Sequence, residues 1–587
     1  MGVGMHLDVL KLEHFRSCLS ASINLKPDLT VLVGENNGGK SNIIDALRLL
    51  TLPLNGRRDR YPEDDDIRRD STEPTFTIEG RFSGLSDTMK GLLISAVPDP
   101  SVDLAILGMR YQAKTATALR GKTRFWAGKF DTAEPEPGAA DLIRHVFLPP
   151  LRDARQVLGS GSATRITALL QHFLETGEES EFLDHVRRTQ APHRVVGAVN
   201  TEIGIALGHL TRGVRPQTAS LEFTTEVLSD VARDLRFRLS DSGVPPQDIR
   251  SSGLGYANLL YMATVIVELA KAREADLTLF LVEEPEAHLH PQLQMLVLDF
   301  LLDQAKKSAT REIPSGQPEG RIQVIVTSHS PNLTAWVSPE HLVVVRSEGD
   351  DTTNTPTPHT VTISIATLGL NSEALQKVSR YLDVTRSSLL FGSRVLLVEG
   401  IAEALLLPVI AKRLVLNGDL HAWQRFRGAV LVPIDGVDFA PYIEVLLRPS
   451  GGSTIADRVV VVTDADPNVL GNRKVDLDNL AEAWGTSKKL SVFINSDTLE
   501  NELFSAGNDT LLKKVFLSQY PQSEHHWTDI MRCEEPQERA IAFVELLKKK
   551  QTRKGDFAQR LSAQIEAGEV FQVPLYLREA IQKVAEQ

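Results

Sequence analysis

The stretch "LTVLVGENNGGKSNIIDALRLL", residues 29–50, decides the fold of the first part of the chain. Its apolar, β-branched opening predicts a buried strand, and the apolar residues that recur at three- and four-residue steps after the glycines predict a helix beginning near Ser41. Between them, "GENNGGKS" fits the pattern G-x-x-x-x-G-K-[ST], whose backbone amides hold phosphates at the positive end of a helix. A strand, a glycine loop and a helix in this order predict a nucleotide-binding α/β domain.

The residues of this loop have distinct expected roles toward ATP. Lys40 would reach the β- and γ-phosphates, and the Ser41 hydroxyl would bind the Mg²⁺ ion that accompanies the nucleotide. The expected nucleotide-contacting residues of the loop are Gly34, Asn37, Gly38, Gly39, Lys40 and Ser41.

Two further strands end in side chains suited to ATP hydrolysis. The strand "LTLFLVEE", residues 277–284, ends in Glu283, expected to hold Mg²⁺ through water, and in Glu284, expected to orient and deprotonate the attacking water. The strand "IQVIVTSHS", residues 322–330, delivers His329 where a γ-phosphate could be sensed. In this order, the glycine loop and these two strand ends predict a composite ATP site.

The stretch "RSSGLGYANLL", residues 250–260, opens a helix with Ser252, Gly253 and Gly255, which would bind the γ-phosphate of a nucleotide held by another subunit. Together with "EEPEAHLHP" at 283–291 and "TSHS" at 327–330, the set resembles the ABC-type ATPases of the branch that contains RecF, the SMC proteins and the OLD (overcoming lysogenization defect) family. The resemblance implies a homodimer through the ATPase region. The chain departs from the usual pattern in Glu283, where many members carry Asp, and in a short signature, and no Q-loop glutamine can be assigned.

A second group of acids follows two other apolar strands. "VVVVTDADPN", residues 459–468, ends in Asp464 and Asp466, and "RVLLVEG", residues 394–400, ends in Glu399, with Glu403 one helical turn further on. Because ligands collect at the carboxyl ends of parallel strands, these acids can converge there. Closely packed carboxylates repel one another unless a divalent cation neutralises them, and oxygen-only ligands favour Mg²⁺ or Mn²⁺. Asp435 and Asp438 are further acids, but a turn between strand and helix explains them equally well.

A glutamate after one strand and D-x-D after a later one resemble the Toprim domain of topoisomerases, primases and some nucleases. An ATPase of this branch followed by Toprim resembles an OLD-family nuclease over essentially the whole chain, and the order also resembles the nuclease subunit of the Gabija antiphage system. The resemblance implies two metal ions across the scissile phosphate. It also assigns Thr498 and Glu500 in "SDTLENELF" to the second metal and Lys554 in "RKGDFAQRL" to charge stabilisation in the transition state.

Length and composition limit the kind of protein. A chain of 587 residues exceeds one hydrophobic core and predicts three or four units. No apolar run approaches a membrane span and no secretory signal is visible, so we expect a cytoplasmic protein without a membrane contact. The distant Cys18 and Cys533 predict neither a disulfide framework nor a zinc site. A net charge of −12 argues against coating of nucleic acid through the overall field but allows local contacts.

The expected architecture is an α/β ABC-type, RecF/SMC-like ATPase head interrupted by a helical dimerisation insertion and followed by a Toprim α/β domain. The expected boundaries are 1–154 and 241–378 for the ATPase, 155–240 for the helical insertion and 379–587 for the Toprim domain. The expected function is an ATP-binding, divalent-metal-dependent DNA endonuclease, gated by nucleotide and used in antiphage defence or DNA processing, with a helicase as a further partner.

Two alternatives use the same modules. The first is a DNA-damage ATPase of the RecF/SMC type whose Toprim module binds DNA or a partner without cutting, although intact acids at the strand ends argue against it. The second is a topoisomerase- or primase-like enzyme, although no module for a nucleophilic tyrosine is apparent.

Overall fold

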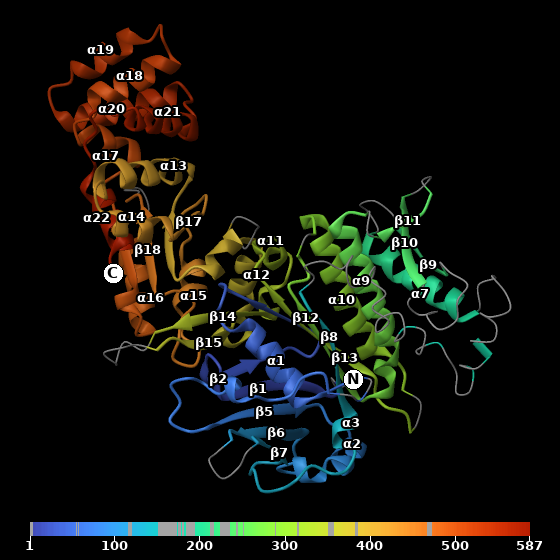
Figure 1. The fold of residues 1–587 in the computed structure, drawn as a ribbon. Helices are drawn as coiled ribbons and strands as arrows, with labels where there is room; N and C mark the ends of the chain where they lie inside the picture. The colour runs from blue at the N-terminus through green and yellow to red at the C-terminus, as the bar shows by residue number, and fades with distance from the viewer. Residues whose placement is uncertain are drawn as a thin grey trace. The chain divides into compact units, whose positions relative to one another are not determined.

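The computed structural model divides into two compact units, residues 1–364 and 365–587 (Figure 1). The domain boundaries expected from the sequence remain predictions. Within the described ranges, no helix is both long and apolar enough to cross a bilayer. The structure describes residues 4–587 except 55, 57, 115–119, 151–168, 170–172, 174–177, 179–180, 183–193, 212–216, 224–234, 242–244, 250–251, 288, 314–315, 350–356, 382–385 and 466–471.

A seven-stranded sheet forms the centre of the first unit, in the order β15-β14-β3-β13-β12-β8-β4. All neighbours run parallel except β14 and β15. Strands β3 and β12 are buried along their whole length, which explains their uninterrupted apolar sequences. The strands are β3 (Leu29–Val33), β4 (Leu52–Pro53), β8 (Ile143–Leu148), β12 (Leu277–Glu283), β13 (Arg321–Ser328), β14 (Leu342–Glu348) and β15 (His359–Ser364).

A five-stranded antiparallel sheet, β2-β1-β5-β6-β7, belongs to the same unit. Along β5, buried and half-buried side chains alternate, as expected for a sheet with one face in the core. Phe15 and Phe82 of this sheet share one apolar core with Ile43 and Leu47 of the helix that follows the glycine loop. The strands are β1 (His6–Phe15), β2 (Cys18–Asn24), β5 (Thr75–Ser83), β6 (Leu104–Gln112) and β7 (Lys122–Ala127).

The segment 155–240, expected to be helical, lies largely outside the described residues. Where it is described, α7 (Arg194–Thr211) is a helix, but β9 (Gln217–Phe223) and β10 (Leu235–Asp241) are antiparallel strands that form a three-stranded sheet with β11 (Gln247–Asp248). The helical expectation is wrong for these two strands. In "LRFRLSD" apolar and polar residues alternate, and this period of two is the signature of a strand.

The remaining helices of the first unit each lie between two successive strands in the chain. Helices α9 and α10 are drawn in green beside α7 in Figure 1. The helices are α1 (Lys40–Leu50), α2 (Asp87–Leu92), α3 (Ala139–Leu142), α9 (Leu254–Glu268), α10 (Pro291–Thr310) and α11 (Pro331–Ala335).

The second unit is built on a four-stranded parallel sheet in the order β17-β16-β18-β19. Because all four strands run the same way, their carboxyl ends lie at one edge of the sheet, and this arrangement positions the acids that follow β16 and β18. The strands are β16 (Arg394–Val398), β17 (Val430–Pro433), β18 (Arg458–Thr463) and β19 (Leu490–Ile494).

Helices surround this sheet and continue into a helical region after β19. An apolar cluster that contains Leu396 and Val460 of the sheet extends through Phe504, Trp527 and Phe543 of the helices, so sheet and helices share one core. The helices are α12 (Ser372–Tyr381), α13 (Ile401–Ile410), α14 (Leu420–Arg427), α15 (Ala440–Leu447), α16 (Arg473–Ala483), α17 (Leu499–Ser505), α18 (Asp509–Gln519), α19 (Glu524–Met531), α20 (Pro536–Lys549), α21 (Lys554–Glu566) and α22 (Leu575–Ala585).

Candidate active sites

The glycine loop joins β3 to α1 and packs closely against β14. A Cβ atom on Gly34 would lie 2.1 Å from the carbonyl oxygen of Val345, and one on Gly38 would lie 2.7 Å from it. Asn37 has φ 64°, a left-handed conformation that asparagine tolerates better than most residues. The loop therefore needs its glycines, and its backbone has the form in which amides can face a phosphate group.

The Lys40 side chain folds back onto the loop. Its ammonium group donates to the carbonyl oxygens of Gly34 and Glu35, both at 2.7 Å. Burial lowers the pKa of Lys40 to about 8, and the carboxylates of Glu284, Glu286 and Glu35 offset part of this effect. These two carbonyl oxygens are the acceptors that the phosphate oxygens of a nucleotide would replace.

Glu283 ends β12 and is hydrogen-bonded to Ser41. Burial raises the pKa of Glu283, and the Ser41 hydrogen bond opposes this rise. The structure thus brings together the hydroxyl and the carboxylate that were expected to share the nucleotide's Mg²⁺ ion. An oxygen pair of this kind suits a hard divalent cation.

Glu284 and His329 meet at the carboxyl ends of β12 and β13. The His329 Nε2 lies 3.2 Å from the Glu284 Oε1, and the His329 Nδ1 lies 3.1 Å from the Gly34 carbonyl oxygen. Burial and the nearby Lys40 lower the pKa of His329, whereas Glu284 raises it. A neutral ring can donate to only one of these two acceptors, so the histidine is poised to change partners. Glu284 itself has φ 44°, a strained conformation typical of functional positions.

Glu286 is a residue whose role the sequence did not predict. Its Oε1 accepts hydrogen bonds from the Ser328 hydroxyl at 2.7 Å and from the His329 backbone amide at 2.8 Å. Burial raises its pKa. Glu286 therefore positions the turn that carries His329, and its place two residues after Glu284 is the signal that could have indicated this role.

The expected signature for a second subunit's nucleotide lies at the start of α9. Gly253 is the N-cap residue and is exposed, Gly255 follows in the first turn, and the Ser252 hydroxyl donates to the Ile249 carbonyl oxygen at 2.6 Å. A helix N-terminus with exposed backbone amides is suited to an anion from outside the chain.

Glu399 and Asp464 follow the adjacent parallel strands β16 and β18 and lie in contact. The Asp464 backbone amide donates to the Glu399 Oε1 at 2.8 Å, and the Thr463 hydroxyl donates to the same oxygen. The Asp464 Oδ1 accepts from the Asn495 side-chain amide. Burial raises the pKa of Asp464 to about 7, and the charges of Glu399, Glu403 and Glu500 add to this rise.

Glu403 and Glu500 complete the acidic pocket, which we define as Glu399, Glu403, Asp464 and Glu500. Burial raises the pKa of Glu403 to about 7, with Glu500 and Glu399 adding to the rise and Lys554 opposing it. The Lys554 ammonium lies 3.3 Å from the Glu500 Oε1. Burial would lower the pKa of Lys554, but Glu500, Asp464 and Glu403 outweigh it and raise this pKa. Three of the four carboxylates thus lie within electrostatic reach of one lysine.

The remaining expected acids and ligands are not part of the acidic pocket as the structure describes it. Asp466 lies outside the described residues. Thr498 is the N-cap of α17, where its hydroxyl accepts from the Asn501 amide at 3.4 Å. Asp438 forms an ion pair with Lys377 at 3.5 Å, and Asp435 is an exposed turn residue with φ 52°.

The carboxylate oxygens of the acidic pocket are suitable ligands for a divalent cation, but their present arrangement is not that of a metal site. Buried carboxylates that repel one another gain from a bound cation, and their oxygens are the ligands that Mg²⁺ and Mn²⁺ prefer. Among the described residues, however, no three His, Cys, Asp or Glu side chains are arranged as a metal-ligand group. The Arg473 guanidinium lies 2.8 Å from the Glu399 Oε1, so one expected ligand oxygen is already bonded to a cation.

Arg473 and Asn495 were not predicted. Asn495 directly follows β19, so the rule that indicated Glu399 and Asp464 could also have found it. Arg473 is the first residue of α16, and nothing in its local sequence indicates that its side chain reaches back to the sheet.

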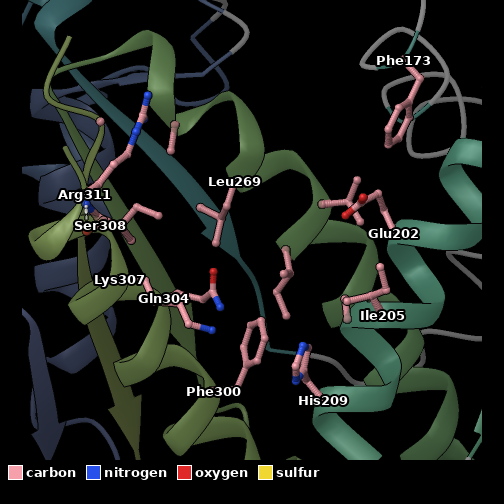
Figure 2. A pocket seen from close by; sticks show the side chains of 16 residues that line it. Phe173, Glu202, Ile205, His209, Leu269, Phe300, Gln304, Lys307, Ser308 and Arg311 are labelled. Atoms are coloured by element: carbon pink, nitrogen blue, oxygen red, sulfur yellow. Dashed lines mark hydrogen bonds between the residues drawn. The ribbon is translucent and has the colours of Figure 1, made fainter. Parts of the chain in front are cut away.

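A cavity of about 720 Å³ in the first unit lies between α7, α9 and α10. Figure 2 shows His209 of α7 beside Phe300 of α10, and their ring centroids are 5.8 Å apart. The residues that line this cavity include none of the predicted site residues.

Comparison with known families gives two matches along the chain. A family model described as "AAA ATPase domain" matches residues 5–124 and 215–334. A model described as "Overcoming lysogenization defect protein-like, TOPRIM domain" matches residues 390–466. The first match places β9 and β10 in the ATPase region, and the second begins just before β16 and ends at Asp466.

Curated relatives match over most of the chain. The Old nuclease of Escherichia phage P2 is 24% identical over 520 residues, which cover 82% of this chain and 81% of the relative. The endonuclease GajA of Bacillus cereus is 22% identical, with 75% and 72% of the two chains covered. The OLD nuclease of Thermus scotoductus is 24% identical, with 67% and 71% covered.

The fold and these matches define an ATPase joined to a Toprim domain, an arrangement that implies the use of a nucleotide and of divalent metal. This confirms the fold class expected from the glycine loop and the acidic strand ends. The chain is thus similar over most of its length to nucleases of the OLD family and to GajA.

Proposed function

We propose that the protein is an ATP-binding DNA endonuclease that hydrolyses phosphodiester bonds at the acidic pocket by a two-metal mechanism. The contact between Glu399 and the Asp464 backbone amide, at 2.8 Å across adjacent parallel strands, carries this proposal. Two divalent ions would activate water and stabilise the leaving oxygen. Glu399, Glu403 and Asp464 would hold the ions, together with Glu500, Asp466 and Thr498.

Lys554 has a separate role in this proposal. Its ammonium group lies at the edge of the pocket, beside Glu500, and its raised pKa keeps it charged at neutral pH. A fixed cation there would stabilise negative charge that develops on the phosphate in the transition state.

The DNA contact finds support in a basic turn next to the pocket, defined as Lys548, Lys549, Lys550, Arg553 and Lys554. This turn joins α20 to α21 and places five cations within seven residues of a chain whose net charge is −12. Lys548, Lys549 and Arg553 are exposed, and none of them forms an ion pair with another described residue. Exposed, unpaired cations beside a phosphodiesterase pocket suit a DNA backbone.

The ATPase unit would act as a gate on cutting. Lys40, Ser41 and Glu283 would hold Mg²⁺–ATP, and Glu284 with His329 would act on the γ-phosphate. Ser252, Gly253 and Gly255 of a second subunit would complete the site in a homodimer. Because such a dimer has different contacts with and without nucleotide, ATP can shift the equilibrium between its states. Antiphage defence or DNA processing is the setting we propose, with a helicase as an additional partner.

One observation favours a second candidate function. Arg473 occupies an oxygen of Glu399, which suits a RecF/SMC-like ATPase whose Toprim unit binds DNA without cutting. The two functions make opposite predictions for metal-dependent cleavage.

Plasmid cleavage tests the proposal. Supercoiled DNA is incubated with the full chain and Mg²⁺ or Mn²⁺, with and without ATP, and the parent is compared with Asp464→Ala and Lys40→Ala. We expect Asp464→Ala to abolish cutting in every condition and Lys40→Ala to remove only the response to nucleotide. If the parent leaves the plasmid intact with both metals, the binding function replaces the nuclease. If Asp464→Ala cuts like the parent, the acidic pocket is not the nuclease centre.

A further inference from the structure

Arg473 has an unusual position for an arginine. It is the first residue of α16, at the positive end of the helix dipole, where a cation is disfavoured. Asn472 caps the helix through its side chain, so Arg473 is not needed for capping. A cation at this end of a helix requires a compensating negative partner.

The acidic pocket supplies that partner. One guanidinium nitrogen of Arg473, Nη1, donates to the Glu399 Oε1 at 2.8 Å, to the Asp464 carbonyl oxygen at 2.9 Å and to the Thr463 hydroxyl. The Arg473 and Glu399 side chains are 16% and 18% exposed, so solvent screens this ion pair only in part. Arg473 therefore joins the carboxyl ends of β16 and β18 through one charged group.

Two cationic side chains form ion pairs with carboxylates of the acidic pocket. Lys554 pairs with Glu500 on one side, and Arg473 pairs with Glu399 on the other. With all four carboxylates ionised, these two cations leave a net charge of about −2, which favours entry of a divalent ion. Arg473 lies on one of the oxygens that such an ion would use.

We propose that Arg473 is an internal competitor of the divalent cation, one that holds Glu399 against β18 and must release it before a metal ion binds there. This inference rests on the proposed metal site and adds its regulation. The exchange of one cation for another keeps the carboxyl ends of the two strands together in both states. It also makes the affinity for metal lower than the carboxylates alone would give.

Calorimetric titration of Mn²⁺ into the full chain, without nucleotide and at pH 8, tests this competition. We expect Arg473→Gln to bind Mn²⁺ roughly tenfold more tightly than the parent, which is the scale of a lost charge-assisted hydrogen bond. Arg473→Lys keeps the charge on a shorter side chain, so we expect a smaller gain. Thermal unfolding checks that each variant is folded, and the lysine variant carries the test if the glutamine variant is not.

Two control variants separate the possible outcomes. Arg458→Gln removes the same charge at the opposite end of β18, where Arg458 binds the carbonyl oxygens of Lys583 and Glu586, and should leave the Mn²⁺ affinity unchanged. Asp464→Asn should remove the binding heat and so assign it to the pocket. Unchanged or weaker Mn²⁺ binding by both Arg473 variants would overturn the competition. Parent binding that does not depend on Asp464 would instead refute the proposed metal site.

Discussion

At the residue scale, the central feature is a set of acids that are costly to ionise together. Asp464 and Glu403 have their pKa values raised to about 7, from ordinary values of 3.8 and 4.5. Groups in this condition hold protons near neutral pH unless a cation replaces them. Binding of a divalent ion to the pocket must therefore displace protons and become stronger as the pH rises.

This linkage predicts a pH dependence of stability. In chelator-treated protein, the folded chain keeps protons on Asp464 and Glu403 up to about pH 7, whereas the unfolded chain loses them near 3.8 and 4.5. Because the folded state binds more protons in this window, the free energy of unfolding contributed by these groups falls as the pH rises from about 4 to about 7. Asp464→Asn should make this fall shallower.

Thermal unfolding in chelator and in Mn²⁺ measures the effect. We expect the stabilisation by Mn²⁺ to grow between about pH 6 and pH 8 in the parent and to be small throughout in Asp464→Asn. The same Mn²⁺-induced shift at every pH would show that the pocket carboxylates do not exchange protons for metal.

The same residues show how far sequence reasoning reaches. Glu399 and Asp464 could be placed together because residues after neighbouring parallel strands must meet at one sheet edge. The position of Arg473 could not be predicted, because its contact with Glu399 depends on how α16 packs. Thr498 is the N-cap of α17, a role that its position could also have indicated, since threonine before a helix is a common N-cap.

At the element scale, long uninterrupted apolar runs predicted strands correctly, whereas the short alternating patterns of β9 and β10 did not. The uninterrupted apolar runs of β3, β12 and β18 predicted buried parallel strands, and the structure confirms them. For β9 and β10 the helical prediction failed, because these short strands lie among segments with helical spacing and the period-two pattern covers only seven residues in each. The folding of α17 to α21 onto the sheet is a long-range apolar effect that local patterns do not show.

The basic turn between α20 and α21 allows a prediction about DNA. We expect Lys548→Ala with Lys549→Ala to weaken binding of duplexes of different sequence to a similar degree. The slope of log K against log salt should become shallower by about 0.9 for each lysine that neutralises a phosphate. Binding measured at several salt concentrations, with Asp464→Ala in the background to prevent cutting, gives this slope.

A matched pair of lysines provides the control. Lys513 and Lys514 lie in α18 of the same helical region but are paired with Glu524 at 3.1 Å and with Glu569 at 2.5 Å. Their replacement by alanine removes the same charge and should change the slope less. If both double variants reduce the slope equally, the effect is one of total charge, and the basic turn has no special role.

At the scale of the whole molecule, two chemical centres lie in two units of one chain. The nucleotide centre combines residues from β3, α1, β12 and β13, and the acidic pocket combines residues from β16, α13, β18 and α17. Both follow one rule, that functional side chains stand at the carboxyl ends of parallel strands. The order of the two units, and hence the similarity to OLD-family nucleases, could be predicted from the sequence because each centre has its own motif. The ion pair between Arg473 and Glu399, which occupies one oxygen of the acidic pocket, could not be predicted from the sequence.

The location of Mn²⁺ by anomalous diffraction, in crystals of the full chain with a short DNA duplex that resists cleavage, tests the central claim most directly. The account predicts anomalous peaks among Glu399, Glu403 and Asp464, next to a DNA phosphate, with Arg473 no longer bonded to Glu399. Crystals with DNA bound, no anomalous peak in the pocket and Arg473 still on Glu399 would contradict it.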